Sequence, residues 1–364
     1  MSAPDAAIER LARALVPLPS QPAGTPWPTA DWPVGDPVPE LDALLDAMHT
    51  DEERYGMTYA TAVVVRGRLV HQRYGGALPH FDRPPTPVEP DTPLLSWSMA
   101  KSVLHSAIGV LVGEGRLALD APAPVAAWAN DARAAITLDE LLCMRDGLAF
   151  TEDYVDSGVS DVIEMLFGEG MVDVAGYAVA RPLKHEPGTV FNYSSGTSNI
   201  VARILGDVVG SADETRAFLR RAIFEPIGMR TAEPRFDDAG TFVGSSYVYA
   251  TALDFARFGL LSLRDGVWDG ARVLPEGWVD HGRRARSRDL ADGRIYGAHW
   301  WVVDDDLGSF WASGYEGQSI LITPGLDTIV VRLGRSLTDA QTDALMEWRA
   351  EMVAALRTAV AARA

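Results

Sequence analysis

Runs of apolar residues near the start of the chain predict a hairpin preceded by a helix. Residues 59–66 and 69–74 are rich in strand-forming side chains, and the short turn Gly67-Arg68 joins them, which is typical of two antiparallel strands. Just before them, apolar residues at helical spacing predict an amphipathic helix; they are Leu41, Leu44, Leu45 and Met48. Residues 17–39 contain eight prolines and two glycines, and therefore predict an irregular segment that lies over the surface.

The middle of the chain has apolar residues at intervals of three and four, which favours helices. The stretches predicted to be helical are 98–115, 137–144, 159–169, 196–210, 213–223 and 252–264. Short apolar runs then predict strands at 299–303, 309–312, 319–322 and 328–331, followed by a terminal helix at roughly 338–362. Because consecutive hairpins pair antiparallel, we expect strands from both ends of the chain to form one antiparallel sheet.

This order of elements predicts an α+β fold in three parts. Residues 1–39 would be an N-terminal extension. Residues 40–97 and 266–364 would build an α/β subdomain around the antiparallel sheet, with helices flanking it. Residues 98–265 would form an inserted, mainly α-helical subdomain that carries the candidate catalytic residues.

The scarcest charged residue marks the strongest candidate for chemistry. The chain has thirty arginines but only two lysines, and Lys101 lies three residues after Ser98 at the start of a predicted helix. Arginine stays protonated at usable pH, whereas a desolvated lysine can lose its proton. A spacing of three residues places both side chains on one helix face, so Lys101 can take the proton of Ser98 and activate it as a nucleophile. The alternative is an ordinary lysine on a helix surface.

Charge and composition narrow the possible partners and compartment. A net charge of −18 disfavours nucleic acid and anionic membranes, and would repel strongly anionic substrates. The single cysteine, Cys143, lies in an apolar run and leaves no partner for an intrachain disulfide. The first twenty residues lack the continuous apolar core of a secretory signal, and no uncharged apolar run is long enough to span a membrane. We therefore expect a cytoplasmic protein.

Two further segments contain candidate site residues. Tyr193 lies at a loop-to-helix junction, where a phenol beside a lysine would have a lowered pKa and could pass a proton to a leaving group. A tyrosine that only packs is the alternative. The tight turn at 314–317 enters a strand beginning near Gln318, whose backbone amide could stabilise an oxyanion. An ordinary hairpin turn explains that pattern equally well.

Three ordered motifs together resemble the serine β-lactamase and penicillin-recognising superfamily. They are Ser98-Met99-Ala100-Lys101-Ser102, Tyr193-Ser194-Ser195 and Gly314-Tyr315-Glu316-Gly317-Gln318. Over roughly residues 40–360, the chain is most similar to the class C-like branch, which holds carboxylesterases and 6-aminohexanoate-dimer (nylon-oligomer) hydrolases. Further matches are Phe150-Thr151-Glu152-Asp153-Tyr154 and Trp300-Trp301. The resemblance implies a β-lactamase-like fold with the active site at the interface of the two subdomains.

The resemblance also implies roles for individual residues. Ser98 would be the nucleophile, Lys101 its base and Tyr193 the acid/base partner. The backbone amides of Ser98 and Gln318 would form the oxyanion hole. The candidate substrate-binding residues are Tyr154, Trp300, Trp301, Tyr315 and Glu316, of which Tyr154 would contact the substrate amide. No metal and no cofactor is implied.

Two departures from the β-lactamase pattern bear on the substrate. Ser195 replaces the Asn that ends the second motif, and Tyr315-Glu316-Gly317 replaces a Lys-Thr-Gly whose lysine binds the β-lactam carboxylate. The acidic Glu316 would repel that carboxylate. Activity as a β-lactamase or D-Ala-D-Ala peptidase is therefore disfavoured.

Other classes of protein fit the sequence less well. A Ser-His-Asp α/β-hydrolase needs a Gly-x-Ser-x-Gly elbow, and a metallohydrolase needs clustered ligands such as His-Glu-x-x-His; the sequence contains neither. A non-enzymatic binding protein of the same fold would be expected to lose Ser98, Lys101 or Tyr193, and all three are present.

We therefore expect a serine hydrolase that acts through an acyl-enzyme. The first hypothesis is hydrolysis of short linear amides of the 6-aminohexanoate-oligomer type, and the second is a carboxylesterase acting on short-chain esters. The expected partner is a small-molecule amide or ester, rather than nucleic acid or a membrane. A homodimer is left open.

Overall fold

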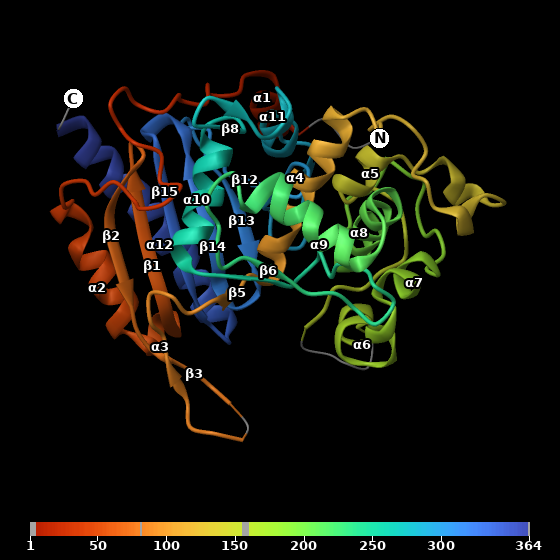
Figure 1. The fold of residues 1–364 in the computed structure, drawn as a ribbon, viewed down its shortest axis with the longest axis horizontal. Coiled ribbons are helices and arrows are strands. Elements are labelled where there is room, and N and C mark those ends of the chain that lie inside the picture. The colour runs from red at the N-terminus through yellow and green to blue at the C-terminus, as the bar shows by residue number, and fades with distance from the viewer. Residues whose placement is uncertain (1–4, 81, 155–159, 363–364) are drawn as a thin grey trace.

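A computed structural model describes residues 5–80, 82–154 and 160–362 of the chain. Figure 1 shows a large sheet on one side of the molecule and a group of helices on the other. The sheet has eight strands in the order β10-β11-β12-β13-β14-β15-β1-β2, and neighbouring strands are antiparallel. These strands are β1 (Met57–Val65), β2 (Arg68–Tyr74), β10 (Ser287–Arg288), β11 (Ile295–Tyr296), β12 (Trp301–Val302), β13 (Phe310–Gly314), β14 (Gln318–Thr323) and β15 (Thr328–Arg335). The prediction of one antiparallel sheet built from both ends of the chain is confirmed.

A period of two along the central strands gives the sheet two buried faces. In β1, Ala62 and Val64 belong to one hydrophobic core, whereas Val63 belongs to the other. The neighbouring strands alternate in the same way: Ile320, Ile322, Ile329, Val331 and Leu333 face the first core, and Leu321 and Val330 face the second. Because successive side chains point to opposite faces, these continuous apolar runs require cover on both sides.

Helices provide that cover. Helices α2 (Asp42–Thr50) and α12 (Asp339–Ala362) lie on one face of the sheet, and α10 (Ala252–Leu263) lies on the face that looks toward the helical part (Figure 1). Gly259 allows α10 to approach closely, because a Cβ there would lie 2.8 Å from Ile320 and 3.0 Å from Ile329. The sequence grouped residues 252–264 with the helical subdomain. Instead α10 packs on β1, β14 and β15. Nearly every side chain along this helix is buried as a result.

The helical part surrounds one central helix, α8. Its helices are α4 (Ala100–Gly113), α5 (Leu138–Leu142), α6 (Asp161–Phe167), α7 (Val174–Val179), α8 (Ser195–Val209) and α9 (Ala212–Leu219), the last continued by a π-helical turn at Arg220–Phe224. All five stretches predicted here contain a helix, while α7 was not predicted; residue 159 of one stretch lies outside the described residues. Ser194 caps α8 by accepting the amide of Thr197 at 2.9 Å, which fixes where this helix begins.

Shorter elements complete the described fold. They are α1 (Ala6–Arg13), α3 (Glu52–Tyr55), α11 (Trp278–Arg283), the pair β3 (Ala77–Leu78) and β4 (Thr86–Pro87), the sheet β5 (Leu94–Leu95), β7 (Val248–Ala250) and β6 (Glu233–Pro234), and the pair β8 (Val267–Trp268) and β9 (Ala271–Arg272). The turn between β1 and β2 consists of Arg66 and Gly67, one residue earlier than predicted. Both have positive φ, 50° and 75°, as a tight hairpin turn requires.

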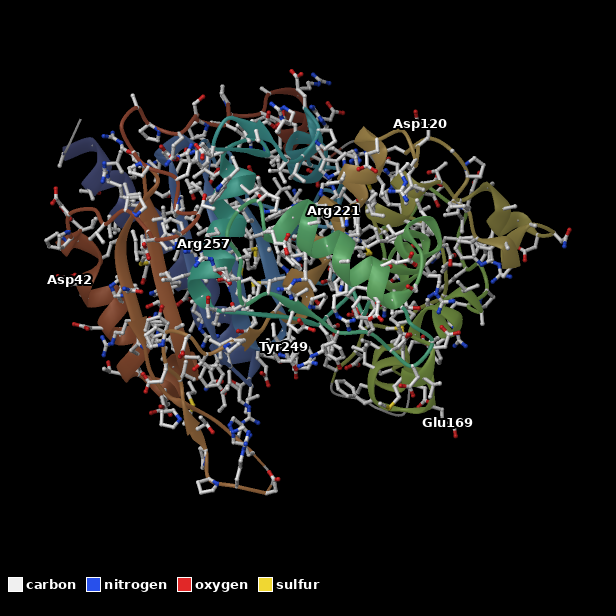
Figure 2. The ribbon with its side chains drawn as sticks, in the orientation of Figure 1. Asp42, Asp120, Glu169, Arg221, Tyr249 and Arg257 are labelled. Carbon is white, nitrogen blue, oxygen red and sulfur yellow. The ribbon has the colours of Figure 1, made fainter. Side chains whose placement is uncertain are left out.

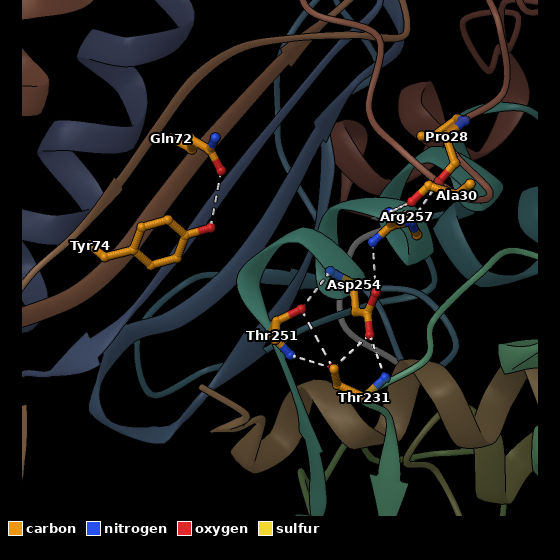
Figure 3. Close-up of polar contacts among 8 residues, drawn as sticks. All are labelled: Pro28, Ala30, Gln72, Tyr74, Thr231, Thr251, Asp254 and Arg257. Atoms are coloured by element: carbon orange, nitrogen blue, oxygen red, sulfur yellow. Dashed lines mark hydrogen bonds and ion pairs between the residues drawn. The ribbon is translucent and has the colours of Figure 1, made fainter. Parts of the chain in front are cut away.

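A proline-rich N-terminal segment is tied to the helix that covers the sheet. Arg257 of α10 donates from Nε to the Pro28 carbonyl at 2.7 Å and from Nη2 to the Ala30 carbonyl at 3.0 Å (Figure 3). Its Nη1 pairs with Asp254 at 2.7 Å, and Asp254 also accepts the amide and hydroxyl of Thr231. The segment is irregular, as predicted, and this buried ion pair holds it in place.

Acidic side chains at the periphery carry part of the large negative charge. Asp42, Asp120 and Glu169 are exposed at the edges of the molecule, whereas Arg257 lies inside it (Figure 2). Cys143, which lies in an apolar run of the sequence, is free and buried. Within the described ranges, no helix combines the length and the apolar character needed to cross a membrane.

Candidate active site

Ser98 lies in a helical turn, Trp97–Met99, that leads directly into α4. Trp97 has φ +44°, a left-handed conformation that a bulky residue rarely adopts, so the chain turns sharply just before the serine. Ser96 holds this turn: its hydroxyl accepts the Val248 amide at 3.1 Å and donates to the Ser246 carbonyl at 3.1 Å. The turn presents Ser98, 9% exposed, to a cavity.

Lys101 follows one turn later and is almost completely buried, with 1% of its surface exposed. Its Nζ lies 3.0 Å from Ser98 Oγ, 3.0 Å from Ser195 Oγ and 3.0 Å from the Ser245 carbonyl. Burial lowers the pKa of Lys101 to about 8, and the charge of Glu152 opposes this shift. A lysine with this pKa exchanges its proton near neutral pH, and its contact with Ser98 is short enough for proton transfer.

Tyr193 comes from the loop just before α8 and lies beside the same lysine. Lys101 Nζ is 4.9 Å from the centre of the Tyr193 ring. Burial raises the pKa of the Tyr193 phenol above its ordinary range, and a hydrogen bond with Ser98 only partly offsets this. The prediction of a lowered pKa is therefore wrong, because desolvation and then the negative charge of Glu152 raise it. A neutral Tyr193 hydroxyl can still donate a proton.

Ser195 and Glu152 extend the hydrogen bonds of Lys101, and the sequence did not single them out as site residues. Ser195 Oγ donates to Glu152 Oε1 at 2.6 Å, and the Ser195 amide donates to Glu152 Oε2 at 2.7 Å. The carboxylate of Glu152 thus contacts Lys101 through the Ser195 hydroxyl. A signal was present in the replacement of Asn by Ser195, since a hydroxyl can accept and donate at once.

Tyr154 joins this group from the loop that carries Glu152. Its hydroxyl donates to Glu152 Oε1 at 2.8 Å, and its ring stacks on Tyr315 with centroids 4.6 Å apart. Burial, with a contribution from Glu152, raises the Tyr154 pKa well above its ordinary value. The Tyr154 hydroxyl is therefore protonated. A chain of hydrogen bonds through Glu152 and Ser195 connects it to Lys101.

The turn between β13 and β14 completes the surroundings of Ser98. Glu316 and Gly317 both have positive φ, 59° and 85°, which makes this connection tight. The Gln318 side chain points away from the serine: its amide group donates to the Gly334 carbonyl and accepts the Gly334 amide at 2.9 Å. Strands β13 and β14 contact the turn that carries Ser98, and a Cβ on Gly314 would lie 2.3 Å from the Ser96 carbonyl. The role of the Gln318 amide in an oxyanion hole stays a prediction.

A cavity of about 260 Å³ lies over the serine. Of the sequence candidates, its lining includes Ser98, Tyr154, Tyr193, Trp301, Tyr315 and Glu316. Trp300 does not line it. This side chain, just before β12, is 2% exposed and packs between Phe258 and Phe310 in the core. The expectation that Trp300 contacts substrate is corrected accordingly.

Comparison with known proteins identifies the family of this chain. A family model described as Beta-lactamase matches residues 41–355. The chain is 27% identical over 321 residues to the 6-aminohexanoate-dimer hydrolase of Paenarthrobacter ureafaciens, covering 82% of this chain and 78% of the relative. It is 28% identical over 276 residues to esterase EstB of Burkholderia gladioli, covering 70% of this chain and 62% of the relative.

Solved structures agree on the fold. A candidate 6-aminohexanoate-dimer hydrolase from Bacillus anthracis is 20% identical, with a TM-score of 0.74 over 96% of this chain and 94% of that one. A penicillin-binding protein from Bacillus halodurans is 19% identical, with a TM-score of 0.65 over 82% of this chain and 98% of that one. The chain therefore belongs to the β-lactamase family, and it is a serine hydrolase of that family.

Proposed function

We propose that the protein hydrolyses short linear amides of the 6-aminohexanoate-oligomer type through an acyl-enzyme on Ser98. The observation that carries this proposal is the 3.0 Å contact between Lys101 Nζ and Ser98 Oγ, with Lys101 buried and its pKa lowered to about 8. The name of the Paenarthrobacter relative supports the substrate class. A cavity of about 260 Å³ is also suited to a slender, linear substrate.

In the acylation step, Ser98 Oγ attacks the substrate carbonyl carbon while its proton moves to the neutral amine of Lys101. The backbone amides of Ser98 and Gln318 would stabilise the negative oxygen that forms. The carbon–nitrogen bond then breaks, and the leaving amine takes a proton from the Tyr193 hydroxyl, which Lys101 replenishes. Water attacks the acyl-enzyme in the reverse sense, releasing the acid and restoring Ser98.

A carboxylesterase acting on short-chain esters is the second candidate function. It is favoured by the Tyr154 hydroxyl, which donates to Glu152 and is therefore engaged before substrate binds. An amide needs a hydrogen-bond donor to help its nitrogen leave, whereas an alkoxide leaves with less assistance. The similarity to esterase EstB also supports this function. β-Lactamase and D-Ala-D-Ala peptidase activities are disfavoured, since Glu316 lines the cavity where those enzymes need a cation.

A substrate panel with a Ser98→Ala control tests the proposal. The panel consists of a 6-aminohexanoate dimer, p-nitrophenyl acetate and nitrocefin. We expect hydrolysis of the dimer and the ester, weak or absent hydrolysis of nitrocefin, and an acyl adduct on Ser98 by intact-mass spectrometry. Ser98→Ala should lose at least about a thousandfold of kcat on each substrate while remaining folded. An active Ser98→Ala variant would remove Ser98 from the reaction.

A further inference from the structure

A buried histidine has a left-handed backbone conformation between β11 and β12. His299 has φ +56°, which costs energy for a residue with a Cβ and which glycine adopts freely. It is only 2% exposed and does not line the Ser98 cavity. Glycine would suit this backbone turn better, so the contacts of the imidazole ring have to explain why a histidine is here.

The ring of His299 joins two helices. Its Nδ1 lies 2.9 Å from the backbone carbonyl oxygen of Lys101 in α4, and its Nε2 lies 3.3 Å from Ser198 Oγ in α8. A carbonyl can only accept a hydrogen bond, so Nδ1 carries the proton and Nε2 accepts the Ser198 hydroxyl. The His299 carbonyl also accepts the Ser102 hydroxyl at 2.7 Å, which adds a second bond to α4.

These two helices supply different parts of the candidate site. Helix α4 carries Lys101 directly after the turn with Ser98, whereas α8 begins at Ser195. Lys101 Nζ connects the helices, because it lies 3.0 Å from both Ser98 Oγ and Ser195 Oγ. Ser198 lies one helical turn after Ser195, so its contact with His299 holds α8 close to the hydroxyl that faces the lysine.

The imidazole of His299 is neutral near neutral pH. Burial, and then the positive charge of Lys101, lower the pKa of His299 to about 3. The ring therefore bonds to the Lys101 backbone without adding a second positive charge beside the amine. The Lys101 pKa of about 8 is left to burial and to the charge of Glu152.

We propose that His299 is a positioning residue for acyl transfer, which holds α4 and α8 at the separation that the contacts of Lys101 require. The proposal rests on the acyl-enzyme function above and assigns no proton transfer to the histidine. Displacing a catalytic group by about 1 Å can cost about a hundredfold in rate. A bond between the two helices that share Lys101 therefore matters to the reaction.

Two variants of similar size that differ in hydrogen bonding test this role. His299→Leu removes both donor and acceptor, whereas His299→Gln keeps both kinds of group. We expect His299→Leu to lower kcat/KM for p-nitrophenyl acetate by about tenfold or more, and His299→Gln to lose less. The ratio kcat/KM covers the steps up to the first irreversible one, so for this ester it reports acylation of Ser98.

A double-mutant cycle with Ser195→Ala separates positioning from general damage to the fold. If His299 acts by holding α8 near Lys101, His299→Leu should cost at least about threefold less in the Ser195→Ala background, because the contact it maintains is already absent. General damage would instead give additive losses. Additive losses, or a wild-type kcat/KM in His299→Leu, would overturn the proposal.

His105→Leu is the matched control. His105 is a buried histidine on the same helix as Lys101, and its ring stacks on Trp278 and contacts His281 Nδ1 at 3.1 Å, both in α11. Per folded molecule, kcat/KM should stay near wild type, with the folded fraction measured by circular dichroism. An equal loss in His105→Leu and His299→Leu would contradict the specific role of His299.

A glycine variant covers the case in which the larger replacements do not fold. His299→Gly removes the ring and also relieves the left-handed strain, so the backbone turn is retained. It should also lose about tenfold or more in kcat/KM, and a wild-type value would overturn the proposal. Failure of the catalytic assignment gives a different result, because hydrolysis would then persist in Ser98→Ala. Failure of the positioning role leaves hydrolysis dependent on Ser98 and unchanged in the His299 variants.

Discussion

Two buried cations in this protein have opposite surroundings, and the difference distinguishes a structural ion pair from a candidate catalytic lysine. Arg257 in α10 contacts Asp254 directly at 2.7 Å and donates to two backbone carbonyls. Lys101 in α4 contacts only neutral oxygens, and the nearest carboxylate reaches it through the Ser195 hydroxyl. A direct ion pair keeps a cation charged, whereas burial among neutral groups lets a lysine release its proton. The Arg257 region therefore holds the fold together, and the surroundings of Lys101 suit the proton transfer that we propose for it.

Lys101→Arg should show the largest effect, although it keeps a positive charge at the site. A guanidinium cannot accept the Ser98 proton at usable pH, and its planar fork does not replace the contacts of an ammonium group. We expect kcat to fall by at least about a thousandfold, nearly as far as in Lys101→Ala. Steady-state kinetics on an amide and an ester, with circular dichroism as a check of folding, measure this. Substantial activity in Lys101→Arg would make Lys101 an electrostatic residue rather than the base.

Asp254→Asn, which removes the partner of Arg257, should lower stability and leave activity nearly unchanged, the reverse of the effect expected for Lys101→Arg. It leaves Arg257 buried without a charged partner and places an amide N–H against the donors of Thr231. Breaking a buried pair from one side costs about 3 kcal/mol or more, so the free energy of unfolding should fall by about that amount. Activity per folded molecule should stay near wild type, since Asp254 does not line the Ser98 cavity. Denaturant unfolding together with activity at low temperature would separate the two effects.

Tyr154→Phe should separate amides from esters. If the hydroxyl helps an amide nitrogen to leave, its loss should cut amide kcat/KM by one to two orders of magnitude, about 1.4–2.7 kcal/mol. Ester hydrolysis should change little, because an alkoxide leaves without that help, while Tyr193→Phe should suppress both reactions. An equal loss on both substrates, or none on either, would exclude Tyr154 from the step that distinguishes them.

Glu152→Gln should give the smallest effect, a shift in pH dependence. The charge of Glu152 raises the pKa of Lys101 against the lowering by burial, so its removal should lower that pKa below its present value of about 8. Because the neutral amine is the base in the proposed mechanism, the rising limb of kcat/KM should move to lower pH. Glu169→Gln removes the same charge from an exposed position on the helical part and serves as the control. A limb that stays in place, or moves to higher pH, would contradict the electrostatic role of Glu152.

Local patterns in the chain were enough to predict most elements and the contact between Ser98 and Lys101. Short apolar runs gave the central strands, and the spacing of three residues between Ser98 and Lys101 gave their contact, because both depend on residues near each other in sequence. The packing partners of a helix, in contrast, can come from distant parts of the sequence. Helix α10 lies on the sheet, and Trp300 lies in the core while Trp301 lines the cavity, since these placements depend on surfaces that meet only in the folded chain.

Residues brought together from distant parts of the chain could not be predicted from spacing. Glu152 meets Lys101 through Ser195, which lies 94 residues after the lysine, and Arg349 reaches the Ser98 cavity from the last helix of the chain. The Tyr193 pKa rises although a lysine is adjacent, because burial, which depends on the whole fold, and the charge of Glu152 both raise it. Sequence thus supplied the contact between Ser98 and Lys101 through local helical geometry. Tertiary packing supplied the burial of Tyr193, the carboxylate of Glu152 beside Ser195, and Arg349 in the cavity wall. Each depends on surfaces that meet only in the folded protein.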